Sequence, residues 1–131
     1  MHTIEENLKK AVIAAQNAYA PYSKFRVGCL IETLSGNTYT ACNVENVSYG
    51  LTSCAERNVI FKAISEEGPQ MQLNAVYVAM EDGKEGSPCG ACWQVIAEFS
   101  DLAKTQVHFF HKKKLISGSV AQFLPFCFRD L

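Results

Sequence analysis

Leu73-Asn74-Ala75-Val76-Tyr77-Val78-Ala79-Met80 is an almost continuous apolar run that contains valine and tyrosine side chains. Such a run is typical of a strand that is buried on both faces of a sheet. A helical pattern precedes it at residues 53–66 and stops near Gly68, and a second helical pattern follows at residues 90–99 after Pro88-Cys89-Gly90. A buried strand between two helices predicts an α/β protein whose helices cover the sheet.

The remaining segments extend this arrangement towards both termini. Thr3 and Glu6 form the sequence pattern of a capping box, and Pro21 stops the helical pattern that follows them. The other predicted elements are a helix at 3–19, a hairpin of strands 26–34 and 38–42 around Ser35-Gly36-Asn37, strands at 105–110 and 113–117, and a short helix at 119–124. We therefore expect a single domain over residues 1–131, folded as a three-layer α-β-α sandwich around a mixed sheet of about five strands.

The composition of the chain argues against several classes of protein. With 48% hydrophobic and 19% charged residues, the 131 residues supply enough apolar side chains for a folded core. Twelve lysine and arginine residues against 13 acidic residues give a formal charge of −1, which argues against a dedicated binder of nucleic acid or of a membrane surface. Because we find neither a secretory signal pattern nor an apolar stretch long enough to span a bilayer, we expect a cytoplasmic protein.

Six cysteines in so short a chain could be explained by disulfides, a metal site or buried thiols. A reducing compartment disfavours a disulfide framework. Cys54-Ala55-Glu56-Arg57 and Pro88-Cys89-Gly90-Ala91-Cys92 lie at the two predicted helix beginnings. A Cys-x-x-Cys pair alone also occurs in redox motifs and structural zinc sites, but with an upstream Cys-x-Glu it is the signature of zinc-dependent nucleobase deaminases. The other three cysteines, Cys29, Cys42 and Cys127, are predicted to be buried thiols.

Cys54, Cys89 and Cys92 are therefore the predicted ligands of one Zn²⁺ per chain. Three protein ligands leave one tetrahedral position for water, as in catalytic zinc sites, whereas a structural site would require a fourth protein ligand. Glu56 lies two residues beyond a ligand and is the predicted general acid–base. We expect Arg57 to offset the negative charge of the thiolates from outside the ligand set, the alternative being an ordinary solvated arginine.

Three further segments are Ala20-Pro21-Tyr22-Ser23-Lys24-Phe25-Arg26-Val27-Gly28, Cys42-Asn43-Val44-Glu45-Asn46-Val47-Ser48-Tyr49-Gly50 and Phe123-Leu124-Pro125. Together with the cysteine segments they make the chain similar to cytidine deaminases of the short, homotetrameric class. This resemblance implies zinc-dependent hydrolytic deamination of cytidine and 2′-deoxycytidine, as in pyrimidine salvage. It also implies a homotetramer in which neighbouring subunits complete each active site, and a small nucleoside as the substrate.

The resemblance also assigns expected roles to individual residues. The resemblance implies that Asn43 and Glu45 bind the ribose. It implies that Phe25 and the backbone of Ala55 contact the pyrimidine. It also implies that Tyr49 and Phe128 are supplied to the active site of a neighbouring subunit. Judged from the residues alone, a self-capping polar loop remains an alternative for Asn43 and Glu45. Ordinary packing remains an alternative for the three aromatic side chains.

Trp93 departs from the family pattern, which commonly has arginine directly after the last ligand. Either Trp93 simply packs against its neighbours, or the loss of a cation near an anionic zinc centre shifts the dependence of activity on pH. The residues after Leu124-Pro125 are also bulkier than usual, which leaves the position of Phe128 open.

Other functions compete with cytidine deamination. The nearest enzyme is a related deaminase that acts on modified cytidines or on a blasticidin-S-type nucleoside. A non-catalytic structural zinc module is the alternative from another class. A polynucleotide-editing deaminase is disfavoured by the low net charge and by the lack of a basic stripe with stacking aromatic residues.

Overall fold

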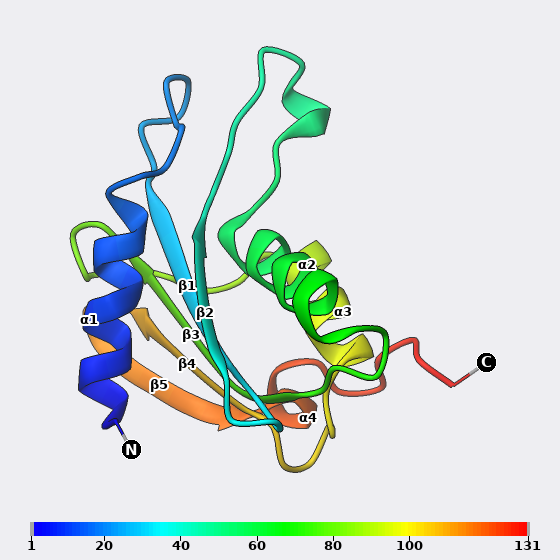
Figure 1. The fold of residues 1–131 in the computed structure, drawn as a ribbon. Coiled ribbons are helices and arrows are strands. Elements are labelled where there is room, and N and C mark those ends of the chain that lie inside the picture. Colours follow the sequence, from blue (N-terminus) through cyan, green and yellow to red (C-terminus); the bar gives the residue numbers. More distant parts are fainter. Residues whose placement is uncertain (1, 131) are drawn as a thin grey trace.

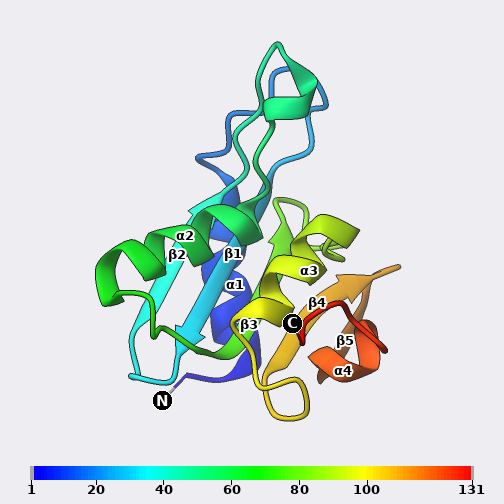
Figure 2. The same ribbon diagram turned by 90° about the vertical axis from the view of Figure 1, so that its right-hand side faces the viewer.

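The computed structural model describes residues 2–130. Within them, five strands form one mixed sheet in the order β2-β1-β3-β4-β5. The elements in chain order are α1 (Ile4–Ala15), β1 (Val27–Thr33), β2 (Thr38–Cys42), the 3-10 helix η1 (Tyr49–Leu51), α2 (Ala55–Glu67), β3 (Leu73–Met80), α3 (Gly90–Glu98), β4 (Gln106–His111), β5 (Lys114–Ser119) and α4 (Val120–Phe123). Figures 1 and 2 show α1 on one face of the sheet and α2 and α3 on the other. The predicted α/β sandwich is confirmed.

The central strand β3 spans Leu73–Met80, which are the predicted bounds. It pairs antiparallel with β1 and parallel with β4, so the sheet is mixed. Its side chains enter two apolar clusters. Val76 and Val78 lie in the larger cluster, beneath α2 and α3, and Tyr77 lies in the smaller cluster with Leu8 of α1. Burial on both faces explains why this strand has almost no polar residues.

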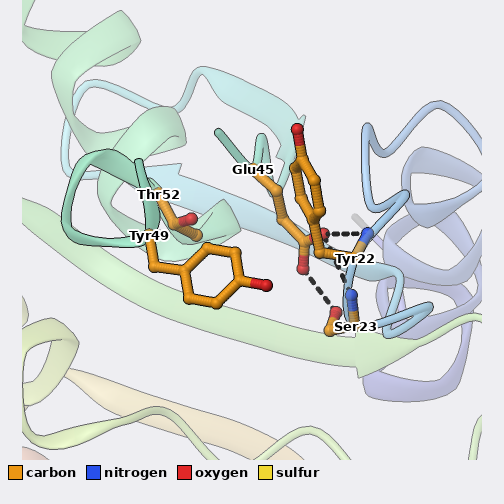
Figure 3. Close-up of a pocket in the computed structure, with 5 residues that line it drawn as sticks. All are labelled: Tyr22, Ser23, Glu45, Tyr49 and Thr52. Atoms are coloured by element: carbon orange, nitrogen blue, oxygen red, sulfur yellow. Dashed lines mark hydrogen bonds between the residues drawn. The ribbon is translucent and has the colours of Figure 1, made fainter. Parts of the chain in front are cut away.

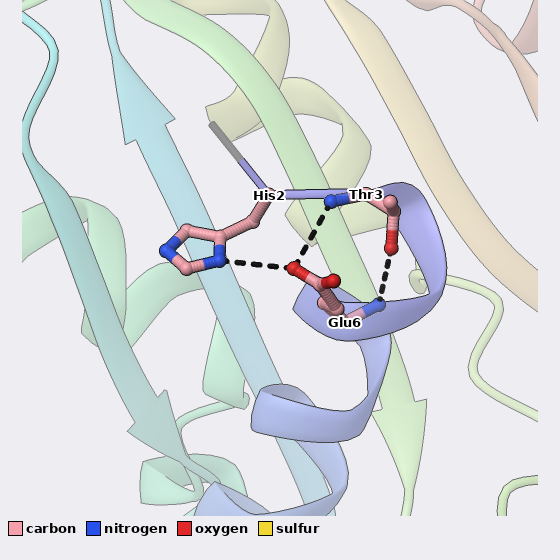
Figure 4. Close-up of polar contacts among 3 residues, drawn as sticks. All are labelled: His2, Thr3 and Glu6. Carbon is pink, nitrogen blue, oxygen red and sulfur yellow. Dashed lines mark hydrogen bonds and ion pairs between the residues drawn. The ribbon is translucent and has the colours of Figure 1, made fainter.

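Helix α1 begins with the predicted capping box (Figure 4). The Thr3 hydroxyl accepts a hydrogen bond from the Glu6 backbone N–H at 3.1 Å, and the Glu6 carboxylate accepts one from the Thr3 N–H at 3.3 Å. His2 Nδ1 lies 3.0 Å from the same carboxylate. The hydrogen bond with His2, followed by that with Thr3, lowers the pKa of Glu6. These contacts satisfy backbone groups that a helix N-terminus otherwise leaves unpaired.

The end of α1 differs from the prediction, because the helix stops at Ala15 and does not continue to residue 19. The Tyr19 N–H donates to the Asn43 carbonyl at 3.1 Å, and the Tyr19 carbonyl accepts from the Glu45 N–H at 2.8 Å. These bonds hold Tyr19 in an extended bridge to the segment after β2. Tertiary pairing therefore overrides the local helical pattern.

The packing of α1 on the sheet depends on a glycine in β1. A Cβ atom at Gly28 would lie 1.8 Å from the Ala11 carbonyl oxygen and 2.7 Å from the Ala15 backbone nitrogen. Only glycine permits so close an approach of helix and strand backbones. Gly28 directly follows Val27, so the same contact fixes the beginning of β1 near the candidate site.

The hairpin of β4 and β5 turns through Lys112 and Lys113, whose φ angles are 50° and 68°. Positive φ at both central residues is characteristic of a type I′ two-residue turn, which is usually built from asparagine and glycine. Both strands begin one residue later than predicted. None of the helices in residues 2–130 has the length and apolar character needed to cross a bilayer.

Candidate functional site

The three predicted zinc ligands meet at the beginnings of two helices. Cys54 is the N-cap of α2, Cys89 is the N-cap of α3, and Cys92 lies in the first turn of α3. The Sγ atom of Cys89 lies 4.0 Å from that of Cys54 and 3.5 Å from that of Cys92, and all three lie within 4.8 Å of one another. Tetrahedral zinc with Zn–S bonds of about 2.3 Å requires sulfurs about 3.8 Å apart. The donor set therefore fits this ion.

Both N-cap cysteines leave their helix ends without a side-chain cap. Serine or aspartate at such a position would direct its oxygen to the backbone N–H groups of the first turn. The cysteine sulfurs make no such bond and point towards each other. The positive end of each helix dipole still favours a negative charge at this point, which stabilises thiolates.

Arg57 is the cation nearest to the cluster, because its Nη2 atom donates to Cys54 Sγ at 3.3 Å. The hydrogen bond with Cys92 is the largest of the effects that lower the pKa of Cys54 to about 5, burial acts against it, and Arg57 adds to it. The same pairing raises the pKa of Cys92, so the Cys92 thiol keeps its proton in the absence of metal. A divalent cation between the sulfurs would displace that proton, since metal-bound cysteine is a thiolate.

Glu56 is 3% exposed and lies on the same turn of α2. It lines a cavity of about 260 Å³ together with Cys54 and Cys89. Burial is the main cause that raises the pKa of Glu56 to about 7, and the charge of Cys54 contributes. A carboxyl group that titrates near neutrality is suited to taking up and releasing protons.

Other parts of the chain close this cavity. Gly86 and Ser87 belong to its lining, as do Val27, Thr52, Met80 and Glu85. A Cβ atom at Gly86 would lie 2.7 Å from the Val78 carbonyl oxygen, so the loop can lie against β3 only with glycine at this position. Thr52, Met80 and Glu85 were not predicted as site residues, although Met80 ends the predicted central strand and the other two flank the cysteine segments.

Asn43 reaches the same cavity and is largely buried. Its Oδ1 accepts from the Val27 N–H at 2.8 Å, and its Nδ2 donates to the Phe25 carbonyl at 2.8 Å. An amide offers two donors and two acceptor positions, so one donor and one acceptor position remain for a further partner. A sugar hydroxyl both donates and accepts hydrogen bonds, so it could pair with the remaining donor and acceptor positions of Asn43.

Glu45 lies in a neighbouring cavity of about 270 Å³, which Figure 3 shows with Tyr22, Ser23, Tyr49 and Thr52. Its carboxylate accepts from the backbone N–H groups of Tyr22 at 2.9 Å and Ser23 at 3.2 Å, and also from the Ser23 hydroxyl. The hydrogen bond from the Ser23 side chain is the largest effect that lowers the pKa of Glu45. Thr52 lines both cavities, so the two cavities adjoin.

The remaining predicted residues have different positions. Phe25 and Phe128 are 63% and 69% exposed, and Ala55 is fully buried at the first position of α2. Trp93 is buried, its ring stacks on Phe123 at a centroid distance of 5.1 Å, and it contacts Phe109 edge-on at 6.0 Å. This position favours the packing alternative for Trp93, which lies in the aromatic core beneath α3.

Comparisons with known proteins give one consistent result. A sequence model described as the cytidine and deoxycytidylate deaminase zinc-binding region matches residues 1–109. The chain is 40% identical over 125 residues to the cytidine deaminase of Sporosarcina psychrophila, covering 95% of this chain and 90% of that protein. It is 39% identical over 122 residues to the cytidine deaminase of Halalkalibacterium halodurans, with 92% and 90% coverage.

Two solved structures extend the similarity to the fold. The crystal structure of cytidine deaminase from Burkholderia pseudomallei has a TM-score of 0.86 at 36% identity and covers 97% of this chain and 100% of its own. The crystal structure from Mycobacterium tuberculosis has a TM-score of 0.85 at 34% identity and covers 98% of both chains. The likeness therefore includes all of the elements that carry the cysteine cluster.

Proposed function

The chain belongs to the cytidine and deoxycytidylate deaminase family, and from this we propose that it hydrolyses cytidine, and also 2′-deoxycytidine, to the uridine nucleoside and ammonia. One observation carries the proposal. The buried carboxyl group of Glu56 shares a cavity with Cys54 and Cys89, and Asn43 lies in the same lining with unused hydrogen-bonding capacity. An acid–base group, a metal site and a hydroxyl partner are the parts that this reaction needs.

Glu56 is the proposed proton carrier. Cys54, Cys89 and Cys92 would hold Zn²⁺, which would supply a water nucleophile at neutral pH by lowering the pKa of that water. Glu56 accepts the proton of the attacking water and delivers it to the ring nitrogen beside the reacting carbon. The hydroxyl left by that transfer adds to the reacting carbon, and Glu56 then moves its remaining proton to the amino group, which leaves as ammonia as the carbon–oxygen double bond forms. The pKa of Glu56, about 7, permits both directions of transfer near neutral pH.

Arg57 and the two helix N-termini have a supporting role in this proposal. Three thiolates and a divalent ion carry a net charge of −1, which opposes ionisation of water at the metal. The Arg57 guanidinium, which donates a hydrogen bond to Cys54 Sγ at 3.3 Å, offsets part of that negative charge. The positive ends of the α2 and α3 dipoles act in the same direction.

Substrate binding is assigned to the two adjoining cavities. We propose that Asn43 and Glu45 hold the ribose hydroxyls, and that the backbone near Ala55 and Ser87 holds the polar edge of the pyrimidine. Both side chains are fixed by hydrogen bonds from the segment 22–27, so they are pre-organised before substrate arrives. Phe25 is proposed to cover the pyrimidine ring.

We further propose a homotetramer in which Tyr49 and Phe128 complete the site of a neighbouring subunit. Tyr49 is 74% exposed, and an exposed tyrosine at a cavity wall is typical of an interface residue. We assign the enzyme to pyrimidine salvage in the cytoplasm, where reducing conditions keep the thiols available.

A substrate panel tests the proposal directly. Purified protein is incubated with cytidine, deoxycytidine, blasticidin S, adenosine and guanine, with and without a chelator, and ammonia release is measured. We expect release from cytidine and deoxycytidine that disappears when the metal is removed and returns when zinc is added. Turnover of blasticidin S alone would favour the related deaminase. Bound zinc without any ammonia release would support the structural zinc module.

A further inference from the structure

Asn58 lies in α2, directly after Arg57, and its side chain leaves the helix to contact two other segments. Its Nδ2 donates to the Cys42 carbonyl at 2.8 Å and to the Ser53 carbonyl at 3.3 Å. Its Oδ1 accepts from the Ser53 hydroxyl at 2.5 Å. One side chain therefore joins the end of β2, the residue before the first cysteine of the cluster and α2 itself.

These contacts explain why an asparagine is found at position 58, inside a helix. Asparagine is a poor helix former, because its side chain competes with the backbone for hydrogen bonds. The Asn58 backbone N–H already donates to the Cys54 carbonyl at 3.0 Å, so the side chain is not needed within the helix. Both of its N–H donors are used across the tertiary contact.

The two segments that Asn58 joins carry different parts of the site. Cys42 directly precedes Asn43 of the proposed ribose contacts, and Ser53 directly precedes Cys54 of the cysteine cluster. The backbones of the same segments also pair, through two hydrogen bonds of 2.9 Å between Val44 and Ser53. The Asn58 side chain ties this pair to α2, the helix that carries Glu56.

We infer that Asn58 is a positioning residue that sets the distance between the ribose contacts and the reacting end of the cavity. Asn58 lines neither of the two cavities assigned to the substrate, and it acts through Asn43 and Cys54. This inference rests on the proposed function, since it assumes that a nucleoside spans the cavity from Asn43 to Glu56. A misplacement of a bound group by a fraction of an ångström is enough to weaken binding and orientation.

The test compares Asn58→Ala and Asn58→Asp with the wild-type enzyme. The aspartate variant keeps the size of the side chain and the acceptor for Ser53, but it cannot donate to the Cys42 carbonyl. We expect both variants to raise the KM for cytidine, and the dissociation constant of the product uridine, by about tenfold. We expect kcat to fall by less than about threefold and the zinc content to stay at the wild-type level. Should Asn58→Ala not fold, Asn58→Asp alone carries the comparison.

Asn37→Ala is the matched control, because Asn37 donates to Ser35 and Glu67 at the opposite end of the sheet. It should leave KM and uridine binding unchanged. A role of Asn58 in stability alone would reduce the folded fraction, and therefore apparent kcat, without a change in KM or in uridine binding; that result would overturn the inference. If the wild-type enzyme does not deaminate cytidine, the proposed function fails first and the inference falls with it.

Discussion

The proposed site has a metal half, with Cys54, Glu56, Cys89 and Cys92, and a nucleoside half, with Phe25, Asn43, Glu45, Tyr49 and Phe128. In the metal half, Cys92 of α3 is 0% and Glu56 of α2 is 3% exposed, whereas Cys54 and Cys89 are the N-caps of these two helices and are more exposed. In the nucleoside half, Phe25 and Phe128 lie in loops and Tyr49 begins the short helix η1, and all three aromatic side chains are mostly exposed. One chain therefore brings the three cysteines together by itself, whereas the aromatic side chains of the nucleoside half remain exposed to solvent.

The largest effect is expected from breaking the metal half at Cys92. Cys92→Ala removes one of three ligands, so the protein should retain almost no zinc and no measurable deaminase activity. Zinc content after dialysis and ammonia release measure the two losses. Cys127→Ala is the control, since this half-buried thiol lies outside the cluster and should keep both. Activity without zinc in the Cys92 variant would contradict the assignment of the ligands.

The next effect separates chemistry from metal binding within the same half. Glu56→Gln keeps the size of the side chain but cannot carry a proton, so we expect kcat to fall by about 10³-fold or more. Zinc content and uridine binding should remain close to those of the wild-type protein. The measurement is single-turnover kinetics at pH 7 together with metal analysis. Substantial turnover by the variant would show that another group transfers the proton.

A smaller effect should come from the nucleoside half. Tyr49→Ala should raise the KM for cytidine by about tenfold and shift the protein towards smaller assemblies, because it removes an exposed aromatic side chain at the cavity wall. Sedimentation and steady-state kinetics measure the two changes. Leu34→Ala is the control, since Leu34 is also exposed but follows β1 in the turn of the β1–β2 hairpin. Equal changes in both variants would argue against a special role of Tyr49.

The spacing of residues in the sequence brings the metal half together but not the nucleoside half, and the physical reason is the range of the interactions involved. Cys54, Glu56 and Arg57 lie within one helical turn, so their spacing alone places them together. The backbone of Phe25 and the side chain of Asn43 meet only through tertiary contact. The same holds for Asn58, whose partners lie in other segments, and no local pattern indicated it.

The differences in the fold have the same origin. The central strand was predicted at its observed bounds, because its burial on both faces leaves a continuous apolar run in the sequence. The predicted end of α1 was wrong, because Tyr19 pairs with Val44, a residue that is distant in the sequence. Trp93 directly follows Cys92, which suggested a role for Trp93 at the metal. Consecutive residues of a helix point in different directions, however, and the Trp93 side chain lies in the aromatic core.

The ligands also come from two places in the chain, since Cys54 precedes α2 and β3 whereas Cys89 and Cys92 follow them. A metal ion held by all three is thus a reversible cross-link that closes a loop around a helix and the central strand. In the chain-entropy description, closing a loop of this length raises the free energy of the unfolded chain by about 4 kcal/mol, because it lowers the conformational entropy of that chain. We expect bound metal to stabilise the closed loop, so that the rate at which a protease cuts within it reports metal occupancy in the absence of substrate.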